Sequence, residues 1–191
     1  MLKDSFRSCC LFLGCVSLLT LTATAQEIVH ALTGTVTSIN SAAKTIQVKT
    51  DDGSEGLFKV LTNANAPIDF EQKVRADAIP AASFTRTNTQ VLVYYFGDGD
   101  ERTAVALEDL GAAPLVKVPG TIVSFKRHEH LLTIKNASGR RLSFHLDDKT
   151  VAETAEGVTE GERLAPNKGD QVRVIAKSAN GTETAVFIRD I

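Results

Sequence analysis

Two stretches of the chain, GDQVRVIAKSANGTETAVFIRDI at residues 169–191 and NTQVLVYYFGDGDERTAVALEDL at residues 88–110, follow one pattern. In each, an apolar run that begins with Gln-Val leads through a turn to a second run that begins with Thr-Ala-Val. The matched residues keep a constant offset of 81 positions: Gln90 with Gln171, Val91 with Val172, Val93 with Val174, Thr103-Ala104-Val105 with Thr184-Ala185-Val186, and Asp109 with Asp190. A constant spacing of this kind indicates an internal repeat.

The repeat continues upstream with a second constant offset of 86 positions. Its matches are Gly34-Thr35 with Gly120-Thr121, Ser38 with Ser124, Lys49 with Lys135, Gly53 with Gly139, and Phe58 with Phe144. The sequence therefore predicts a duplicated domain of roughly 75 to 80 residues. The segment GAAPLVKVPG at residues 111–120 separates the copies with small residues and prolines, which gives units at 26–114 and 115–191.

Short β-strands account for the pattern inside each unit. Ile46 and Val48 alternate with polar neighbours, as expected for a sheet with one wet face. The expected strands are 32–40, 44–50, 56–61, 90–96 and 103–110 in the first unit, and 119–125, 130–136, 141–146, 171–177 and 184–191 in the second. Five short strands per unit predict an all-β chain of two small barrels, in which closure removes exposed strand edges. VAETAEGVTEGERL at residues 151–164 is a candidate for a short helix between strands three and four.

The motif G-T-[VI]-x-S at residues 34–38 and 120–124, the following apolar hairpin around a glycine turn, and LAPNKGDQVRV at residues 164–174 resemble a known group of domains. These are the small OB-like domains of unknown function found, often in tandem, in exported bacterial proteins. The resemblance implies two tandem five-stranded OB-like barrels and an exported location, and it implies no activity. The first unit departs from the pattern, because Asn88 stands where the second unit has Gly169.

The first 25 residues are predicted to be a secretory signal peptide. Two basic residues precede an apolar run that ends in Ala23-Thr24-Ala25, which places cleavage after Ala25. A membrane anchor is an alternative, although the run is shorter than the ~20 residues of a spanning helix. Lipidation of Cys15 is another. We therefore expect a periplasmic or extracellular protein whose mature chain has no cysteine and no transmembrane segment.

Charge argues against one class of partner. Residues 26–114 carry 7 basic and 12 acidic side chains, a net of −5, and residues 115–191 carry 12 and 10, a net of +2. An exported chain so close to neutral is poorly suited to tracking phosphate backbones, so nucleic acid is not the expected partner. The opposite signs of the two units would help them dock, and scattered surface charge is the alternative explanation, which we favour.

Three histidines in the second unit are the candidate metal ligands. His128 and His130 alternate near a turn, and His145 lies on the next expected strand. Imidazoles on one strand face are suited to zinc or copper, which makes a periplasmic metal-binding protein one alternative. The matching positions of the first unit are Ala42 and Lys44, and solvated turn histidines explain the pattern equally well.

The most informative feature is the expected strand at residues 90–96, which has no polar, solvent-facing side. Leu92, Tyr94 and Phe96 alternate with Val91 and other apolar residues, so both faces of this strand are apolar. Either the second unit, the linker or the long loop at 61–89 covers this face, or the face binds a ligand or a protein partner.

No catalytic or nucleotide-binding motif occurs in the sequence, so we expect neither an enzyme nor a cofactor. The function that the sequence favours is an exported, non-catalytic binding or structural module of the bacterial cell envelope. Its partner would be a protein or glycan of the envelope. A hydrolase of envelope polymers is the remaining alternative, and it would need converging carboxylates with a shifted pKa.

Overall fold

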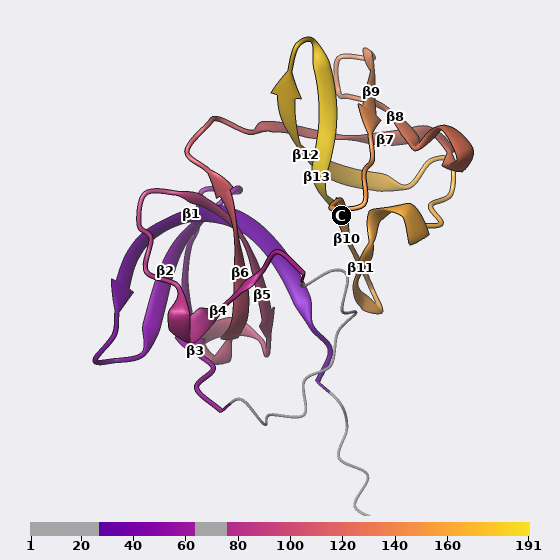
Figure 1. The fold of residues 1–191 in the computed structure, drawn as a ribbon. Coiled ribbons are helices and arrows are strands. Elements are labelled where there is room, and N and C mark those ends of the chain that lie inside the picture. The colour runs from indigo at the N-terminus through magenta and orange to yellow at the C-terminus, as the bar shows by residue number, and fades with distance from the viewer. Residues whose placement is uncertain (1–26, 64–75) are drawn as a thin grey trace, which may run out of the picture.

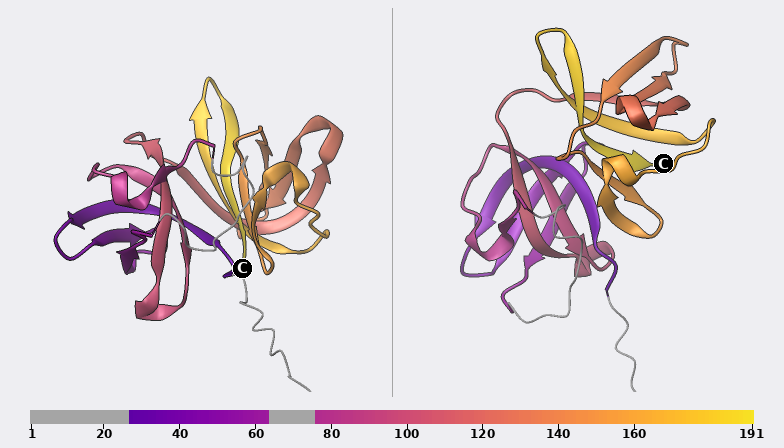
Figure 2. Two further views of the ribbon diagram at one scale, coloured as in Figure 1. Left: turned by 60° about the horizontal axis from the view of Figure 1, so that its bottom comes forward. Right: turned by 45° about the vertical axis from the view of Figure 1, so that its right-hand side comes forward.

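The computed structural model describes residues 27–63 and 76–191, and this part of the chain is all-β (Figure 1). It contains strands and four short 3-10 helices and no α-helix. The strands form two sheets, each curled into a barrel (Figure 2). The predicted signal peptide lies outside the described residues.

The first barrel has the strand order β3-β2-β1-β5-β6 and is closed by parallel pairing of β3 with β6. Its strands are β1 (His30–Asn40), β2 (Thr45–Thr50), β3 (Glu55–Val60), β5 (Gln90–Phe96) and β6 (Thr103–Gly111). Counting these five strands in chain order, the circuit is 1-2-3-5-4-1. This circuit defines the OB fold.

The second barrel repeats the same circuit as β9-β8-β7-β12-β13, closed by a parallel bridge between Thr184 and His145. Its strands are β7 (Val116–Lys126), β8 (Leu131–Lys135), β9 (Arg141–His145), β12 (Gln171–Ala179) and β13 (Thr182–Asp190). The predicted all-β, OB-like fold class is confirmed. The chain passes from the first barrel to the second between Gly111 and Val116, inside the predicted linker.

The shared Gly-Thr motif has a steric cause. A Cβ at Gly34 would lie 2.5 Å from the carbonyl oxygen of Lys49, and one at Gly120 would lie 2.8 Å from that of Lys135. No side chain fits at such a distance, so the first two strands of each barrel approach closely only with glycine there. Both copies then contain a β-bulge two to four residues further on, at Val36/Ser38 and at Ile122/Ser124.

Each barrel has its own apolar core, made by the inward residues of its strands. Phe58 and its counterpart Phe144 are almost completely buried at the centres of the two cores. The alternate residues of β5, Val91, Val93 and Tyr95, belong to the first core. Each unit therefore buries its inner face independently, as the alternation in the sequence predicts.

The connection between strands three and four differs between the barrels. In the first it contains β4 (Ile79–Pro80) and a 3-10 helix (Ala81–Ser83); in the second it contains β10 (Val151–Thr154), β11 (Gly157–Glu160) and a 3-10 helix (Gly161–Arg163). The predicted short helix at 151–164 is therefore wrong. β10 pairs in parallel with β13, and Gly157 takes a positive φ of 107° that ends the turn of the hairpin. The ladder to β13 supplies hydrogen bonds that a helix there would have to replace.

The two barrels are docked through the outer faces of corresponding strands. Leu92 and Tyr94, 1% and 0% exposed, form one cluster with residues of the second barrel. The principal members from the second barrel are Val151, Ile175 and Phe187. The apolar outer face of β5 is thus covered, mainly by β12 and β13. Phe96 lies at the end of β5, is only partly buried and is outside this cluster.

Polar contacts add to this interface at its edges. The Val158 amide donates to the Val29 carbonyl (3.0 Å), so the chain just before β1 pairs with β11 of the other barrel. Lys117 of the second barrel pairs with Asp51 of the first, and Lys149 with Asp77. The positive unit thus meets the negative one with complementary charges.

Replacing Leu92 by alanine should test the interface. We expect a loss of about 2–5 kcal/mol in the free energy of unfolding, because the substitution leaves a cavity between the barrels. The matched control is Leu57→Ala, at a side chain that is 54% exposed, for which a change within about 0.5 kcal/mol is expected. Urea denaturation of both variants measures the difference. Equal losses in the two variants would contradict the interface described above.

Candidate functional site

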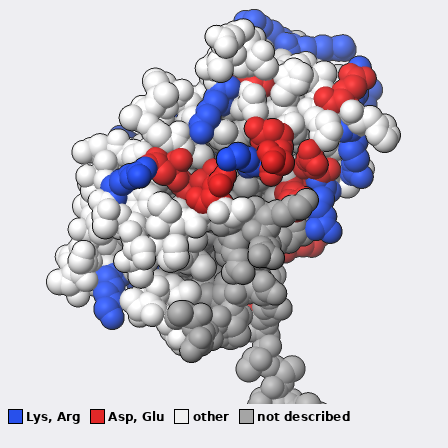
Figure 3. Space-filling model, viewed as in Figure 1, with Lys and Arg blue, Asp and Glu red and all other residues white. Residues whose placement is uncertain are grey.

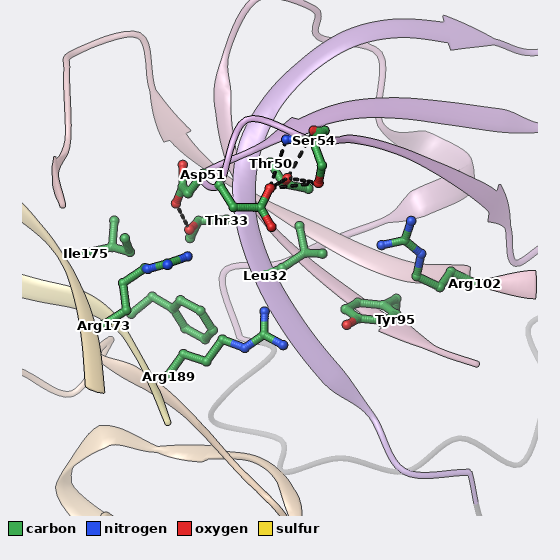
Figure 4. A pocket seen from close by; sticks show the side chains of 12 residues that line it. Leu32, Thr33, Thr50, Asp51, Ser54, Tyr95, Arg102, Arg173, Ile175 and Arg189 are labelled. Atoms are coloured by element: carbon green, nitrogen blue, oxygen red, sulfur yellow. Dashed lines mark hydrogen bonds between the residues drawn. The ribbon is translucent and has the colours of Figure 1, made fainter. Parts of the chain in front are cut away.

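A cleft of about 220 Å³ opens beside the apolar interface and is lined by both barrels (Figure 4). The first barrel contributes residues of β1, of the β2–β3 turn and of β5. The second contributes residues of β12 and β13. Buried apolar residues, among them Leu32, Ile175 and Phe187, lie beneath it. Pockets at such domain junctions are common ligand sites.

Three arginines point into this cleft from its two sides (Figure 4). Arg173 and Arg189 are directly paired across β12 and β13, so both side chains leave the same face of the sheet. Arg102 comes from the first barrel, just before β6. Its Nε donates to the Gly99 carbonyl (2.8 Å), and its guanidinium lies 4.8 Å from the ring centroid of Phe58. The hydrogen bond to Gly99 and the contact with the Phe58 ring fix the position of the Arg102 side chain. Its guanidinium group faces the cleft (Figure 4).

The guanidinium groups of the cleft differ in the hydrogen bonds and ion pairs that they make within the protein. Arg189 Nε lies 3.3 Å from Glu153 Oε2. Arg173 makes no hydrogen bond or ion pair with any residue of the described ranges. Two adjacent guanidinium groups repel each other, and an anion placed between them relieves that repulsion. The planar forks of arginine also suit the paired oxygens of a carboxylate, sulfate or phosphate.

Glu153 anchors the arginine side of the cleft. Its carboxylate is 7% exposed and lies between His30 Nδ1 of β1, at 3.1 Å, and Arg189. Burial raises the pKa of Glu153, and Arg189 and His30 oppose that rise. The three side chains connect β1 of the first barrel to β10 and β13 of the second, so they fix the position of Arg189.

The β2–β3 turn forms the opposite edge of the cleft. Asp51 is 6% exposed and is neutralised by Lys117, and its second oxygen accepts from Thr33. Asp52 is exposed, and its Oδ1 accepts from the Thr50 hydroxyl and from both the hydroxyl and the amide of Ser54. These hydrogen bonds, that of Thr50 first, hold the pKa of Asp52 well below its usual range. Asp52 is therefore a fixed anionic acceptor at this edge.

Tyr95 supplies a neutral donor to the cleft, beside Arg102. Its ring packs edge-on against Phe58, with ring centroids 5.4 Å apart, and the residue is 9% exposed. Burial raises the pKa of its phenol, and Glu153 adds to the rise. The hydroxyl stays protonated at neutral pH and has no hydrogen-bond partner within the described ranges.

The residues singled out from the sequence lie elsewhere. Leu92 and Tyr94 are inside the barrel interface. His128 and His130 are exposed on the turn before β8, where His130 Nδ1 pairs with Glu162 (2.9 Å), and His145 is exposed on β9. Within 27–63 and 76–191, no three His, Cys, Asp or Glu side chains are grouped so as to hold a metal ion. The metal hypothesis stays a prediction that no preformed cluster supports.

A second recess, of about 310 Å³, has the opposite charge. Asp77, Glu108, Asp148 and Glu160 line it together with Lys149. Acidic side chains gather along the junction of the barrels on the face shown in Figure 3. Burial, and then the charge of Asp77, raise the pKa of Glu108, to which Tyr94 donates a 3.4 Å hydrogen bond. Lys149 pairs with Asp77 at 2.6 Å, so this recess already holds its own counter-charge.

Sequence reasoning missed the arginine cleft, although the repeat contained a signal for it. The offset of 81 places Arg173 on Leu92, Arg189 on Glu108 and Arg102 on Glu183. Each cleft arginine therefore occupies a position at which the other copy has an apolar or acidic residue. A search for such charge differences on the outer strand faces would have selected Arg173 and Arg189, whereas Arg102 lies just before β6.

Comparison with known proteins adds little to this description. No protein-family profile matches the chain, and no curated protein matches it. Among solved structures the chain is similar to drosophila Unr CSD456, with 16% identity and a TM-score of 0.32. The match covers 84% of this chain and 61% of that one, so this chain spans about three fifths of its length. The OB assignment rests on the strand pairings and not on this similarity.

Among the described residues, no helix has the length and apolar character needed to cross a membrane.

Replacing Glu108 by glutamine should stabilise the protein in a pH-dependent way. A carboxyl with a raised pKa in the folded state binds its proton more tightly there than in the unfolded chain, so its ionisation costs stability as pH rises above 4.5. Glutamine does not ionise. The gain in unfolding free energy should thus be largest at pH 7.5 and should vanish at pH 4, as followed by urea denaturation.

Glu55→Gln, at an exposed carboxylate of β3, makes the same chemical change away from the recess and is the control. A gain from Glu108→Gln that is equal at both pH values would contradict the burial argument.

Proposed function

We propose that this protein is an exported, non-catalytic binding module that takes a small anionic ligand in the cleft between its two barrels. The anionic group is a carboxylate, sulfate or phosphate, borne by a small molecule or by the end of an envelope glycan. The observation that carries the proposal is the convergence of Arg102, Arg173 and Arg189 from both barrels.

The energetics favour a ligand here over a purely structural role for the arginines. A structural arginine is ordinarily satisfied by carboxylates or carbonyls, as Arg102 and Arg189 partly are. Arg173 lies beside another cation in a semi-enclosed cleft, and among the described residues it has no hydrogen bond or ion pair and only the longer-range attraction of Asp52. In such a cleft the effective dielectric constant is below that of water, so an incoming anion is held more strongly than on an open surface.

Binding is favoured over hydrolysis by the state of the cleft carboxylates. General acid catalysis needs a carboxyl that keeps its proton near neutral pH. Asp51 is occupied by Lys117 and Thr33, and the pKa of Asp52 is lowered. The recess around Glu108 has a carboxyl with a raised pKa, yet its neighbour Asp77 is paired with Lys149. We therefore assign neither site a catalytic role.

A small ligand is favoured over a nucleic acid by the size and edges of the cleft. At about 220 Å³ the cleft is smaller than the roughly 300–1,000 Å³ of ordinary small-molecule sites. The Asp52 carboxylate borders it, and its charge would repel a continuous phosphate backbone. The cell envelope, to which the predicted signal peptide directs the chain, is rich in acidic glycans.

Arg173→Gln should weaken anion binding by about tenfold or more, because it removes a charge-assisted donor from the cleft. The measurement is isothermal titration with sodium sulfate and with cyclohexanecarboxylate at low ionic strength. The control is Arg141→Gln, which removes an exposed arginine of β9 outside the cleft and should leave the affinity within about twofold, as expected for a distant, screened surface charge. If neither anion binds, or if the two variants weaken binding equally, the proposed site is wrong.

Export is tested separately by expression of residues 1–191 in a bacterial host. The expected product, recovered from outside the cytoplasm, is a chain that begins at Gln26, as measured by intact mass. Recovery only of a cytoplasmic chain that retains Lys3 would overturn this part of the proposal.

A further inference from the structure

We infer that the ligand of this cleft is a sugar acid, a single ring that carries one carboxylate and several hydroxyls. This inference rests on the proposed function and names its ligand. It follows from the unequal chemistry of the two edges of the cleft. The second barrel presents the cationic donors Arg173 and Arg189, and the β2–β3 turn of the first barrel presents the Asp52 carboxylate surrounded by hydroxyls, with Arg102 further along the same side.

The acceptor edge has an unused oxygen. All three hydrogen bonds from Thr50 and Ser54 converge on Oδ1 of Asp52. Oδ2 accepts none from the described part of the chain. The Asp52 carboxylate is held rigidly by its turn and remains ionised, so Oδ2 is a preorganised acceptor for a ligand hydroxyl.

The same carboxylate limits the charge of the ligand. A second anionic group at the Asp52 edge would be repelled, whereas a hydroxyl there donates a charge-assisted hydrogen bond. A ligand that spans the cleft therefore has its anionic group at Arg173 and Arg189 and neutral donors at its other end. A hydroxylated monocarboxylate fits this division between Arg173 and Arg189 on one side and Asp52 on the other.

The surface between the edges suits a ring. Leu32 lies between Arg189 and the β2–β3 turn, and Tyr95 lies beside Arg102 (Figure 4). An apolar patch with a phenol hydroxyl packs against the CH face of a sugar and donates to one of its oxygens. The volume of about 220 Å³ is that of a site for one ring and not for an extended oligomer.

Three probes separate the contributions of charge, ring and hydroxyls. D-Galacturonate has all three, cyclohexanecarboxylate has the ring and the carboxylate, and D-galactose has the ring and the hydroxyls. Isothermal titration of the mature chain should show galacturonate binding about tenfold more tightly than cyclohexanecarboxylate, because of the hydrogen bond to ionised Asp52. Galactose should bind more weakly than either acid.

The substitution Asp52→Asn tests whether Asp52 causes the tighter binding of galacturonate than of cyclohexanecarboxylate. Asparagine keeps an oxygen for the turn hydrogen bonds and removes the charge that the hydroxyl contacts. We expect galacturonate to lose most of its tenfold advantage and cyclohexanecarboxylate to bind at least as tightly as before, which also shows that the variant is folded. Asp100→Asn, at an exposed aspartate between β5 and β6 that does not line the cleft, should leave the difference between the probes unchanged.

The outcomes of these titrations test the sugar-acid ligand separately from the anion-binding function. Equal affinities of the wild-type chain for galacturonate and cyclohexanecarboxylate would overturn the sugar-acid inference and leave the anion site standing. An advantage that survives Asp52→Asn would likewise overturn it. Failure of both acids and of sulfate to bind the wild-type chain would overturn the proposed function as well.

Discussion

The packing of one barrel's outer sheet face against the other's is the constraint on which the rest of the structure depends. An OB barrel buries its inner face by itself, but β5 is apolar on its outer face as well. Leu92 and Tyr94 on that outer face are shielded from solvent only because Ile175 and Phe187 of the other barrel cover them. Burial of this apolar surface supplies the main driving force for docking. Docking in turn brings Arg102 of one barrel opposite Arg173 and Arg189 of the other. The cleft is thus a product of the interface and belongs to neither barrel alone.

The outer faces of the two repeated units differ in charge, and this difference produces the charge pattern around the interface. Glu108 and Arg189 are equivalent positions of the two copies, and they lie in recesses of opposite sign. The inner faces have diverged much less, as the paired cores around Phe58 and Phe144 show. An inner position must keep its volume and polarity for the barrel to close, whereas an outer position is free to change once its neighbours change with it. Ligand recognition therefore arises where the repeat is least regular.

Most of the fold was predictable from the chain, and the failures have a common origin. Ten strands and their turns follow from alternation and from glycine positions such as Gly34 and Gly120, which are local properties. The segment 151–164 is not helical, although its four glutamates and two alanines favour a helix locally. Its actual pairing with β13 is a contact between distant parts of the chain. The sequence did not predict the cleft for the same reason. Its residues Asp52, Arg102 and Arg173 are far apart in the sequence, and no motif links them.

The sequence by itself determined two repeated units of five short strands and a strand face that required cover, because hydrophobic periodicity and turn chemistry act over a few residues. Only the tertiary structure decided what covers Leu92 and Tyr94, and which charges meet at the edge of that contact. The physical reason is that docking depends on the summed shape and apolar area of two surfaces, each assembled from several strands. A cleft between two such surfaces has residues that become neighbours only after both barrels have folded and met.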